Sequence, residues 1–425
     1  MSVFKNLRKY IKLALTLFLK TGISIVIFPL ALVIALIVRT RSHAGSTWQI
    51  LMAGIETSAN LRQISHALGT VTDYTVDMAE FLEHPFYSQV PFDCKKVITV
   101  LTLFASDSFF IRAWKIVLRP FYMFPVLFRY DVIFFNWAES FLPGNADLVV
   151  FKLARKKIFV RHCGSDVRYR PLQHGVHSQF GVYQWRDGKR SCFSLIKKAW
   201  HQRMAERFAT VMSTRDHATF QKGELTIRPY IQTELPKTTG FQRERPLLVH
   251  APSDPRIKGT DIVVEVVNKL KEKGFNFDFQ LLSGVEHETV LKYLSEATII
   301  IDQPGAVPAR FSVEGMASGC VVVGGNVPEI NDCDSCPVVR FKPDADSLEK
   351  VLERLLTDQN LCEQIGDEGR RYWKDKCSIE NYLAFFKDLL AGEAPTFSRV
   401  PEHENYLWIA AETWYEKMAL KLLYR

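Results

Sequence analysis

Several features that mark particular protein classes are missing from this 425-residue chain. Its eight cysteines are scattered, which excludes a small disulfide framework, and Cys333 and Cys336 lack the second pair or the histidine that a zinc site needs. Long Lys/Arg blocks and RNP-like aromatic motifs are absent, so nucleic acid is not an expected partner. The chain also contains no Asn-x-Ser/Thr acceptor, which disfavours a lumenal domain in a eukaryote.

The composition is that of a globular protein with a basic and aromatic bias. Hydrophobic residues make up 47% and charged residues 24%, the net charge is +8, and there are 30 phenylalanines. The length allows two ordinary domains. Positive charge combined with aromatic residues suits an anionic membrane surface or phosphorylated substrates.

Residues 21–38 form an uncharged apolar run, at the lower limit for a helix that spans a membrane. The run is long for a signal peptide and no good cleavage site follows, so we expect a retained membrane segment. Basic residues before the run place the N-terminus in the cytosol by the positive-inside rule, whereas Pro29 would allow a kinked segment that returns to the same side. The topology stays open. We expect the protein to be associated with the cytoplasmic face of the inner (plasma) membrane.

From residue 47 onward, short apolar runs alternate with longer amphipathic ones. This alternation predicts an α/β protein with two doubly wound, Rossmann-like domains that face a cleft. We expect strands over 48–55, 130–136, 156–164, 209–214, 246–252, 277–284, 298–304 and 320–325, with helices between them. The expected parts are a membrane segment with basic flanks (1–44), an acceptor-side domain (45–235), a donor-binding domain (236–395) and a C-terminal helix packed on the first domain (396–425).

The segment 97–130 is exceptionally aromatic and also contains several arginines and lysines. Two interpretations are open. It is a buried helix pair of the first domain, or it is a surface that docks into the headgroup region of a membrane.

The second half carries three motifs in a characteristic order: "HAPSDPRIKGTD" at 250–261, "TIIIDQ" at 298–303 and "RFSVEGMASGCVVVGGNVPEI" at 310–330. Together they resemble the donor-binding domain of GT-B glycosyltransferases, in particular glycosyltransferase family 4, over residues 246–390. The likeness is looser in the first half, where it depends on "YDVIFFNW" and "HCGSDVR". It implies a retaining enzyme that uses a nucleotide-sugar donor and needs neither a metal nor a cofactor.

The resemblance assigns the donor diphosphate to the loop before a helix that begins near residue 260. Lys258, followed by Gly259, stands where the family has its diphosphate-binding lysine, and an ammonium there would stabilise the departing phosphate charge. The family commonly adds an arginine where this chain has Ser253, and Arg256 would compensate for it.

The resemblance also assigns the nucleotide and the sugar. Glu314 matches the second of two family glutamates, which contacts the ribose, whereas the first is replaced by Ala306. The remaining expected donor-side residues are Asp302 and Gln303 beside the sugar, the amides of Ser312 and Val313 at a helix N-terminus, and Gly325 and Glu329 in the turn that closes the nucleotide pocket.

On the acceptor side, His162 lies near the position of a family histidine that faces the sugar, and a structural role at the end of a strand is the alternative. Asp166 and Arg168 would orient the acceptor or hold the turn. Gly54, Glu56 and Thr57 follow the first expected strand and would face the cleft. We name His162, Lys258 and Glu314 as catalytic.

These observations predict a membrane-associated retaining glycosyltransferase that moves a sugar from a nucleotide sugar to a lipid-linked or cell-surface glycan, as in polysaccharide biosynthesis. The alternative is a catalytically inactive GT-B subunit or scaffold of a glycan-assembly complex. The missing arginine at 253 and glutamate at 306 favour that alternative. A nucleotide-sugar epimerase on the same fold is a further enzyme class.

Overall fold

The computed structural model describes residues 2–39, 47–57, 60–83, 96–137, 139–173, 189–214, 220–221, 223–227, 229–255, 258–303, 309–325, 335–398 and 402–424. The chain divides into two compact units. The first comprises residues 1–167, 196–213 and 223–226, and the second comprises residues 168–195, 214–222 and 227–425. The predicted domain boundaries, and the docking of residues 396–425 on the first domain, stay predictions.

The strands of the first unit belong to an eight-stranded sheet, in which they follow the order β7-β6-β5-β4-β1-β2-β3, and β1 to β6 are paired in parallel. These strands are β1 (Trp48–Ile55), β2 (Tyr74–Leu82), β3 (Lys96–Val97), β4 (Val132–Asn136), β5 (Lys157–Arg161), β6 (Thr210–Ser213) and β7 (Leu225–Ile227). β1 pairs in parallel with β2 and β4, and β5 pairs in parallel with β4 and β6. The central strands are buried apolar runs, as strands covered on both faces are.

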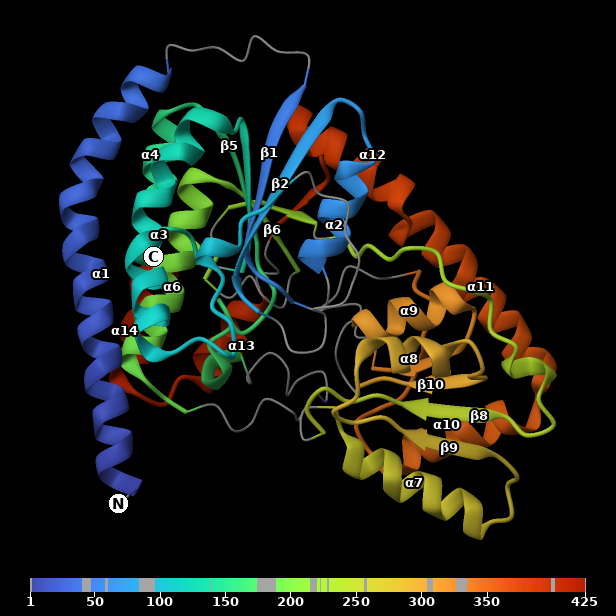
Figure 1. Ribbon diagram of the computed structural model, residues 1–425. Coiled ribbons are helices and arrows are strands. Elements are labelled where there is room, and N and C mark those ends of the chain that lie inside the picture. The colour runs from blue at the N-terminus through green and yellow to red at the C-terminus, as the bar shows by residue number, and fades with distance from the viewer. Residues whose placement is uncertain are drawn as a thin grey trace. The chain divides into compact units, whose positions relative to one another are not determined.

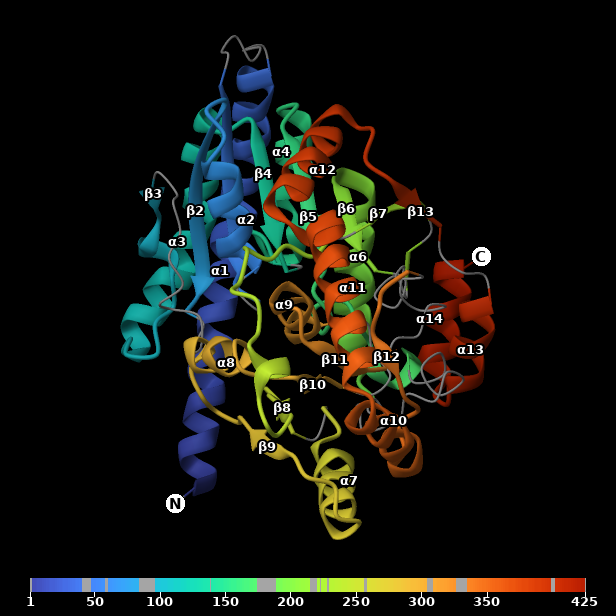
Figure 2. The same cartoon turned by 90° about the vertical axis from the view of Figure 1, so that its right-hand side faces the viewer.

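The helices of the first unit are α1 (Ser2–Arg39), α2 (Asn60–Gly69), α3 (Phe109–Arg129), α4 (Asp147–Leu153) and most of α6 (Cys192–Phe208). α1 runs beside α3 and α4 (Figures 1 and 2). The helix pair considered for residues 97–130 is wrong, because the segment contains the single α-helix α3, preceded by a short 3-10 turn at Thr99–Leu101. Ser108 caps α3 by accepting a hydrogen bond from the Ile111 N–H at 3.4 Å.

The second unit contains a five-stranded sheet of order β12-β11-β10-β8-β9. Its strands are β8 (Leu247–His250), β9 (Asp278–Leu281), β10 (Ile299–Ile301), β11 (Val321–Gly324) and β12 (Val339–Arg340), all paired in parallel. Alternate strand residues contribute to two cores: Val249, Ile300 and Val322 lie in one, and Leu248, Ile301 and Val323 lie in the other.

Helices cover both faces of this second sheet (Figure 1). The first core includes side chains of α8 (His287–Leu294), α9 (Arg310–Ser318) and α11 (Gln359–Cys377). The second includes side chains of α7 (Thr260–Glu272) and α10 (Ala345–Thr357). The remaining elements are α12 (Ile379–Ala391), β13 (Thr396–Phe397), α13 (Glu402–Ala410) and α14 (Trp414–Tyr424). The α/β class with parallel sheets is confirmed, whereas the tail predicted as one helix forms two.

Candidate functional site

The loop between β8 and α7 is held by a buried histidine at the end of β8. His250 Nδ1 donates to the carbonyl oxygen of Ile301 at 2.7 Å, which leaves Nε2 to accept from the Thr260 hydroxyl at 2.9 Å. Burial lowers the pKa of His250, consistent with this neutral form. Gly259, with φ of 64°, supplies the left-handed turn before α7. Lys258 is thereby fixed beside the carboxyl end of β10.

Asp302, directly after β10, connects Lys258 to α9. Its Oδ1 lies 3.0 Å from Lys258 Nζ and accepts the Gln303 N–H at 2.8 Å, and its Oδ2 accepts the Ser312 hydroxyl at 2.5 Å. Burial alone would raise the pKa of Asp302, but the Lys258 charge and the hydrogen bonds lower it overall, so the carboxylate is ionised. The ammonium of Lys258 uses one of its three donors on Asp302, which leaves two for an anionic ligand.

Glu314, within α9, is held by two basic side chains. Both His287 Nε2 and Arg310 Nε lie 2.7 Å from the same oxygen, Oε1, and Arg310 Nη1 also donates to the Ile231 carbonyl at 3.1 Å. Burial would raise the pKa of Glu314, but Arg310 and His287 lower it overall. Among the described residues, both of these contacts use Oε1 and neither uses Oε2. One ionised oxygen therefore remains to accept from a ligand.

The other donor-side predictions have mixed outcomes. Gly325 donates its N–H to the Gln303 carbonyl at 2.9 Å, which ties the ends of β10 and β11 together. The Val313 N–H donates to the Ala309 carbonyl at 3.2 Å, so this amide belongs to the helix ladder. Ser253 is exposed on the loop. Arg256 and Glu329 lie outside the described residues.

In the first unit, polar groups gather where β1, β4 and β5 end. Asn136 Nδ2, at the end of β4, donates to the Ile55 carbonyl at 2.6 Å and to Thr57 Oγ1 at 3.1 Å. Thr57 Oγ1 lies 3.3 Å from Cys163 Sγ. A Cβ on Gly54, where φ is 127°, would lie 2.0 Å from the Asn136 carbonyl oxygen. Only glycine fits there, and the close strand approach brings these groups together.

Glu56 has a structural role at the start of α2. Its carboxylate accepts backbone N–H bonds from Thr57 at 2.6 Å, Leu61 at 3.2 Å and Arg62 at 3.0 Å. Burial raises the pKa of Glu56, and the three N–H bonds oppose that shift. These bonds satisfy amides that the helix start leaves unpaired, and the acceptor-side role of Glu56 stays a prediction.

His162 is fully buried after β5. Its Nδ1 lies 3.3 Å from Asp166 Oδ2, and its backbone N–H donates to the Met212 carbonyl at 2.9 Å. Asp166 Oδ1 also accepts the N–H groups of Gly164 at 2.7 Å and Cys163 at 3.2 Å, which closes the turn. Arg168, by contrast, is half-buried and belongs to the second unit. The acceptor-facing roles of His162 and Arg168 stay predictions.

Sequence reasoning missed three of these residues: Asn136, His287 and Arg310. The only signal for Asn136 was its place at the end of an apolar strand, and Arg310 stood inside the motif that carries Glu314. His287 is the first residue of α8 and lies 27 positions before Glu314 in the sequence. Its contact with Glu314 depends on how α8 and α9 pack.

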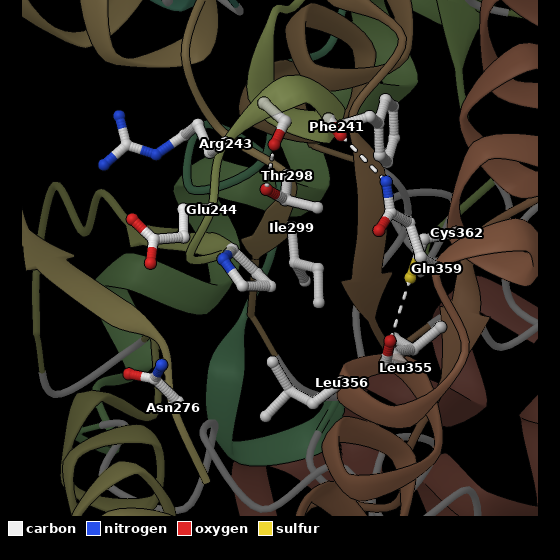
Figure 3. A pocket seen from close by; sticks show the side chains of 12 residues that line it. Phe241, Arg243, Glu244, Asn276, Thr298, Ile299, Leu355, Leu356, Gln359 and Cys362 are labelled. Atoms are coloured by element: carbon white, nitrogen blue, oxygen red, sulfur yellow. Dashed lines mark hydrogen bonds between the residues drawn. The ribbon is translucent and has the colours of Figure 1, made fainter.

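The second unit also contains a cavity of about 290 Å³ at the opposite, amino-terminal edge of its sheet (Figure 3). Thr298 and Ile299 at the start of β10 line it, together with Phe241, Arg243 and Leu356. Parallel sheets of this kind bind their ligands at the carboxyl ends of the strands, so this cavity is not the expected donor site.

No family model matches the chain, and no curated protein matches it. Solved structures with a similar fold include sucrose-phosphate synthase from Thermosynechococcus elongatus, which is 15% identical with a TM-score of 0.55 and covers 81% of this chain and 100% of its own. HepE from Anabaena, in complex with UDP and glucose, is 12% identical with a TM-score of 0.54 and covers 81% and 100%. A glycosyltransferase from Rickettsia africae is 12% identical with a TM-score of 0.53 and covers 81% and 99%. This chain therefore has the fold of the GT-B glycosyltransferases.

Proposed function

We propose that the protein is a membrane-associated retaining glycosyltransferase that uses a nucleotide sugar and acts on a lipid-linked or cell-surface glycan. The observation that carries this proposal is Lys258, which Asp302 holds at the carboxyl edge of a parallel sheet; in the part of the chain that the structure describes, its ammonium uses one of three donors there. HepE, which has a similar fold, was solved with UDP and glucose. UDP-sugars are accordingly the first donors to test.

Chemically, transfer breaks the bond between the sugar and the diphosphate, and negative charge grows on the leaving nucleotide. Lys258 would neutralise that charge in a site where Asp302 already fixes the ammonium. Glu314 would accept a hydroxyl of the nucleoside through Oε2, because Arg310 and His287 occupy only Oε1. Retention of the anomeric configuration follows from the resemblance alone, and so does the acceptor class.

The test is a thermal-shift screen of the detergent-solubilised full chain with UDP-, GDP-, ADP- and CMP-sugars. A donor at 100 times its Kd adds about 2.7 kcal/mol to the free energy of unfolding, which such a screen detects. Lys258→Ala and Glu314→Gln should abolish the shift. Lys269→Ala is the matched control, because the Lys269 side chain is 40% exposed on α7 and pairs with Glu265 on the same helix. A full shift with Lys258→Ala would remove Lys258 from the site.

The alternative, a catalytically inactive GT-B subunit of a glycan-assembly complex, is supported by Ser253, which stands where the family has arginine, and by Ala306, which replaces the first glutamate. The same screen separates the two functions. Folded protein that responds to none of the four nucleotide sugars would favour the inactive subunit.

A further inference from the structure

The apolar helix α1 has two different faces. Phe18–Arg39 is long and apolar enough to cross a membrane, by length and composition. Yet one face of it is a buried seam repeating every three or four residues, formed by Ser24, Ile27, Ala31, Ala35 and Val38. This face packs on α3 and α4 of the first unit (Figure 1). Small residues at such a seam let two helices approach closely.

The opposite face of α1 is exposed and predominantly apolar, with Thr21 as its exposed polar side chain before Arg39. Its exposed large side chains are Phe18, Leu19, Ile25, Val26, Leu30, Val33, Leu36 and Ile37. An apolar surface of this extent is unusual on a soluble protein and marks contact with lipid or with another protein.

The neighbouring helix α3 adds exposed aromatic side chains. Phe110 is 78% exposed, Trp114 64% and Phe128 53%. These residues, with Phe121, follow spacings of four and seven and so lie on one face of α3. Aromatic side chains on a helix face are typical of helices that lie in the membrane interface.

Packing against α3 is difficult to reconcile with an α1 that crosses the bilayer. The seam from Ser24 to Val38 covers about 21 Å of helix at 1.5 Å per residue. If that length stood across the hydrocarbon, the flank of the first unit would enter it as well. α3 carries ionised side chains along this flank: Lys115 pairs with Asp107 at 2.8 Å near its start, and Arg129 pairs with Asp77 at 2.7 Å at its end. Ionised groups at that depth are costly.

The charge pattern identifies the surface that α1 faces. No Asp or Glu precedes Glu56, whereas seven lysines and arginines do: Lys5, Arg8, Lys9, Lys12, Lys20, Arg39 and Arg41. Positive charges beside an apolar face, with no negative charges among them, complement an anionic leaflet. Two copies of this chain facing each other would bring like charges together, which disfavours a dimer through the same face.

We propose that α1 and α3 form a monotopic membrane-docking surface. α1 lies along the first unit and inserts its outward face into one leaflet of an anionic bilayer, so that the chain does not cross the membrane. This inference deepens the membrane association in the proposed function, and it does not depend on glycosyl transfer.

The first test is flotation of the full chain with vesicles of phosphatidylglycerol and phosphatidylcholine. The variant Phe110→Ser with Trp114→Ser should bind at least tenfold more weakly, because two large apolar side chains leave the lipid. Leu422→Ser is the matched control: Leu422 is 74% exposed on α14, and its loss should leave binding unchanged. Thermal unfolding checks that all variants fold. Equal binding by the α3 variant would contradict the proposal.

The second test is topological. Epitope tags before Met1 and after Arg425 are exposed to protease in sealed membrane vesicles of each orientation. The proposal predicts that both tags are digested from the same side, and digestion from opposite sides would overturn it. A chain that binds no vesicles and forms dimers would also overturn it. The nucleotide-sugar screen in detergent is independent of all these results, so failure of docking and failure of the proposed function are distinguishable.

Discussion

Asp302 shows how much one side chain can organise. It holds an ammonium, a hydroxyl and a backbone amide at the end of β10. Its pKa is lowered against the effect of burial, so its contribution to stability is present above the ordinary pKa of aspartate. That contribution is lost as the pH falls through the lower pKa of the folded state.

Replacing this carboxylate tests the arrangement. Asp302→Asn should weaken nucleotide-sugar binding and lower the free energy of unfolding by about 1–3 kcal/mol, because Lys258 loses its buried partner. Asp278→Asn is the control, since Asp278 pairs with Arg243 at 3.0 Å on the surface, where a pair contributes about 0–1 kcal/mol. Calorimetry and urea unfolding measure both quantities. Equal effects of the two substitutions would contradict a special role for Asp302.

His201 gives a prediction for pH. Burial, followed by the charge of Lys197, lowers the pKa of His201 to about 4, with Glu139 and Asp166 opposing and His162 adding to the shift. Between pH 6.5 and pH 4, His201 is protonated in the unfolded chain but neutral in the folded chain. The free energy of unfolding therefore falls as the pH drops from 6.5 toward 4. Between pH 7 and pH 5, the free energy of unfolding should therefore fall by up to about 2 kcal/mol more in the wild type than in His201→Gln. Urea unfolding at several pH values measures this difference. If the free energies of unfolding of the wild type and His201→Gln changed equally with pH, the lowered pKa of His201 would be contradicted.

At the scale of elements, α11 packs closely on the end of α9. A Cβ on Gly366 would lie 2.3 Å from the carbonyl oxygen of Gly319, whereas a Cβ on Gly369 would lie 3.3 Å from the flexible Met316 side chain. Gly366→Ala should therefore destabilise the protein by about 1–3 kcal/mol despite its gain in helix propensity. Gly369→Ala should be nearly neutral. Denaturant unfolding measures both, and two equal values would contradict the packing.

The elements that the sequence predicted well are those with uninterrupted apolar runs. β1, β4, β10 and β11 are buried on both faces, so their composition alone marks them. β2 was missed because Asp77 and Glu80 interrupt its pattern. Both are buried in the fold: Asp77 accepts the Tyr130 hydroxyl at 2.7 Å, and Glu80 pairs with Arg62 at 2.9 Å.

Tyr130 is distant from Asp77 in sequence, and Arg62 lies on a different element from Glu80, so no local sequence pattern predicts these contacts. The same limit applies to the site. Lys258, Asp302 and Glu314 stood in recognisable motifs, whereas the contact of His287 with Glu314 arises only from packing. The seam of α1 was also hidden, because in an apolar helix both faces have the same composition.

At the scale of the whole molecule, each compact unit carries its own group of polar side chains at the carboxyl edge of a parallel sheet. The second unit presents Lys258, Asp302 and Glu314, and the first presents Asn136, Thr57 and Cys163. The first unit also carries the apolar helix α1. This distribution is the one that the proposed function and the proposed membrane-docking surface require.

The most direct measurement is calorimetric binding of UDP, GDP, ADP and CMP to the full chain in detergent, compared with Lys258→Ala and Lys269→Ala. The account predicts that the wild type binds one of these nucleotides. It further predicts that Lys258→Ala weakens this binding at least tenfold, or about 1.4 kcal/mol, while Lys269→Ala leaves it within twofold. Equal affinity in Lys258→Ala, or no binding by folded wild-type protein, would contradict it.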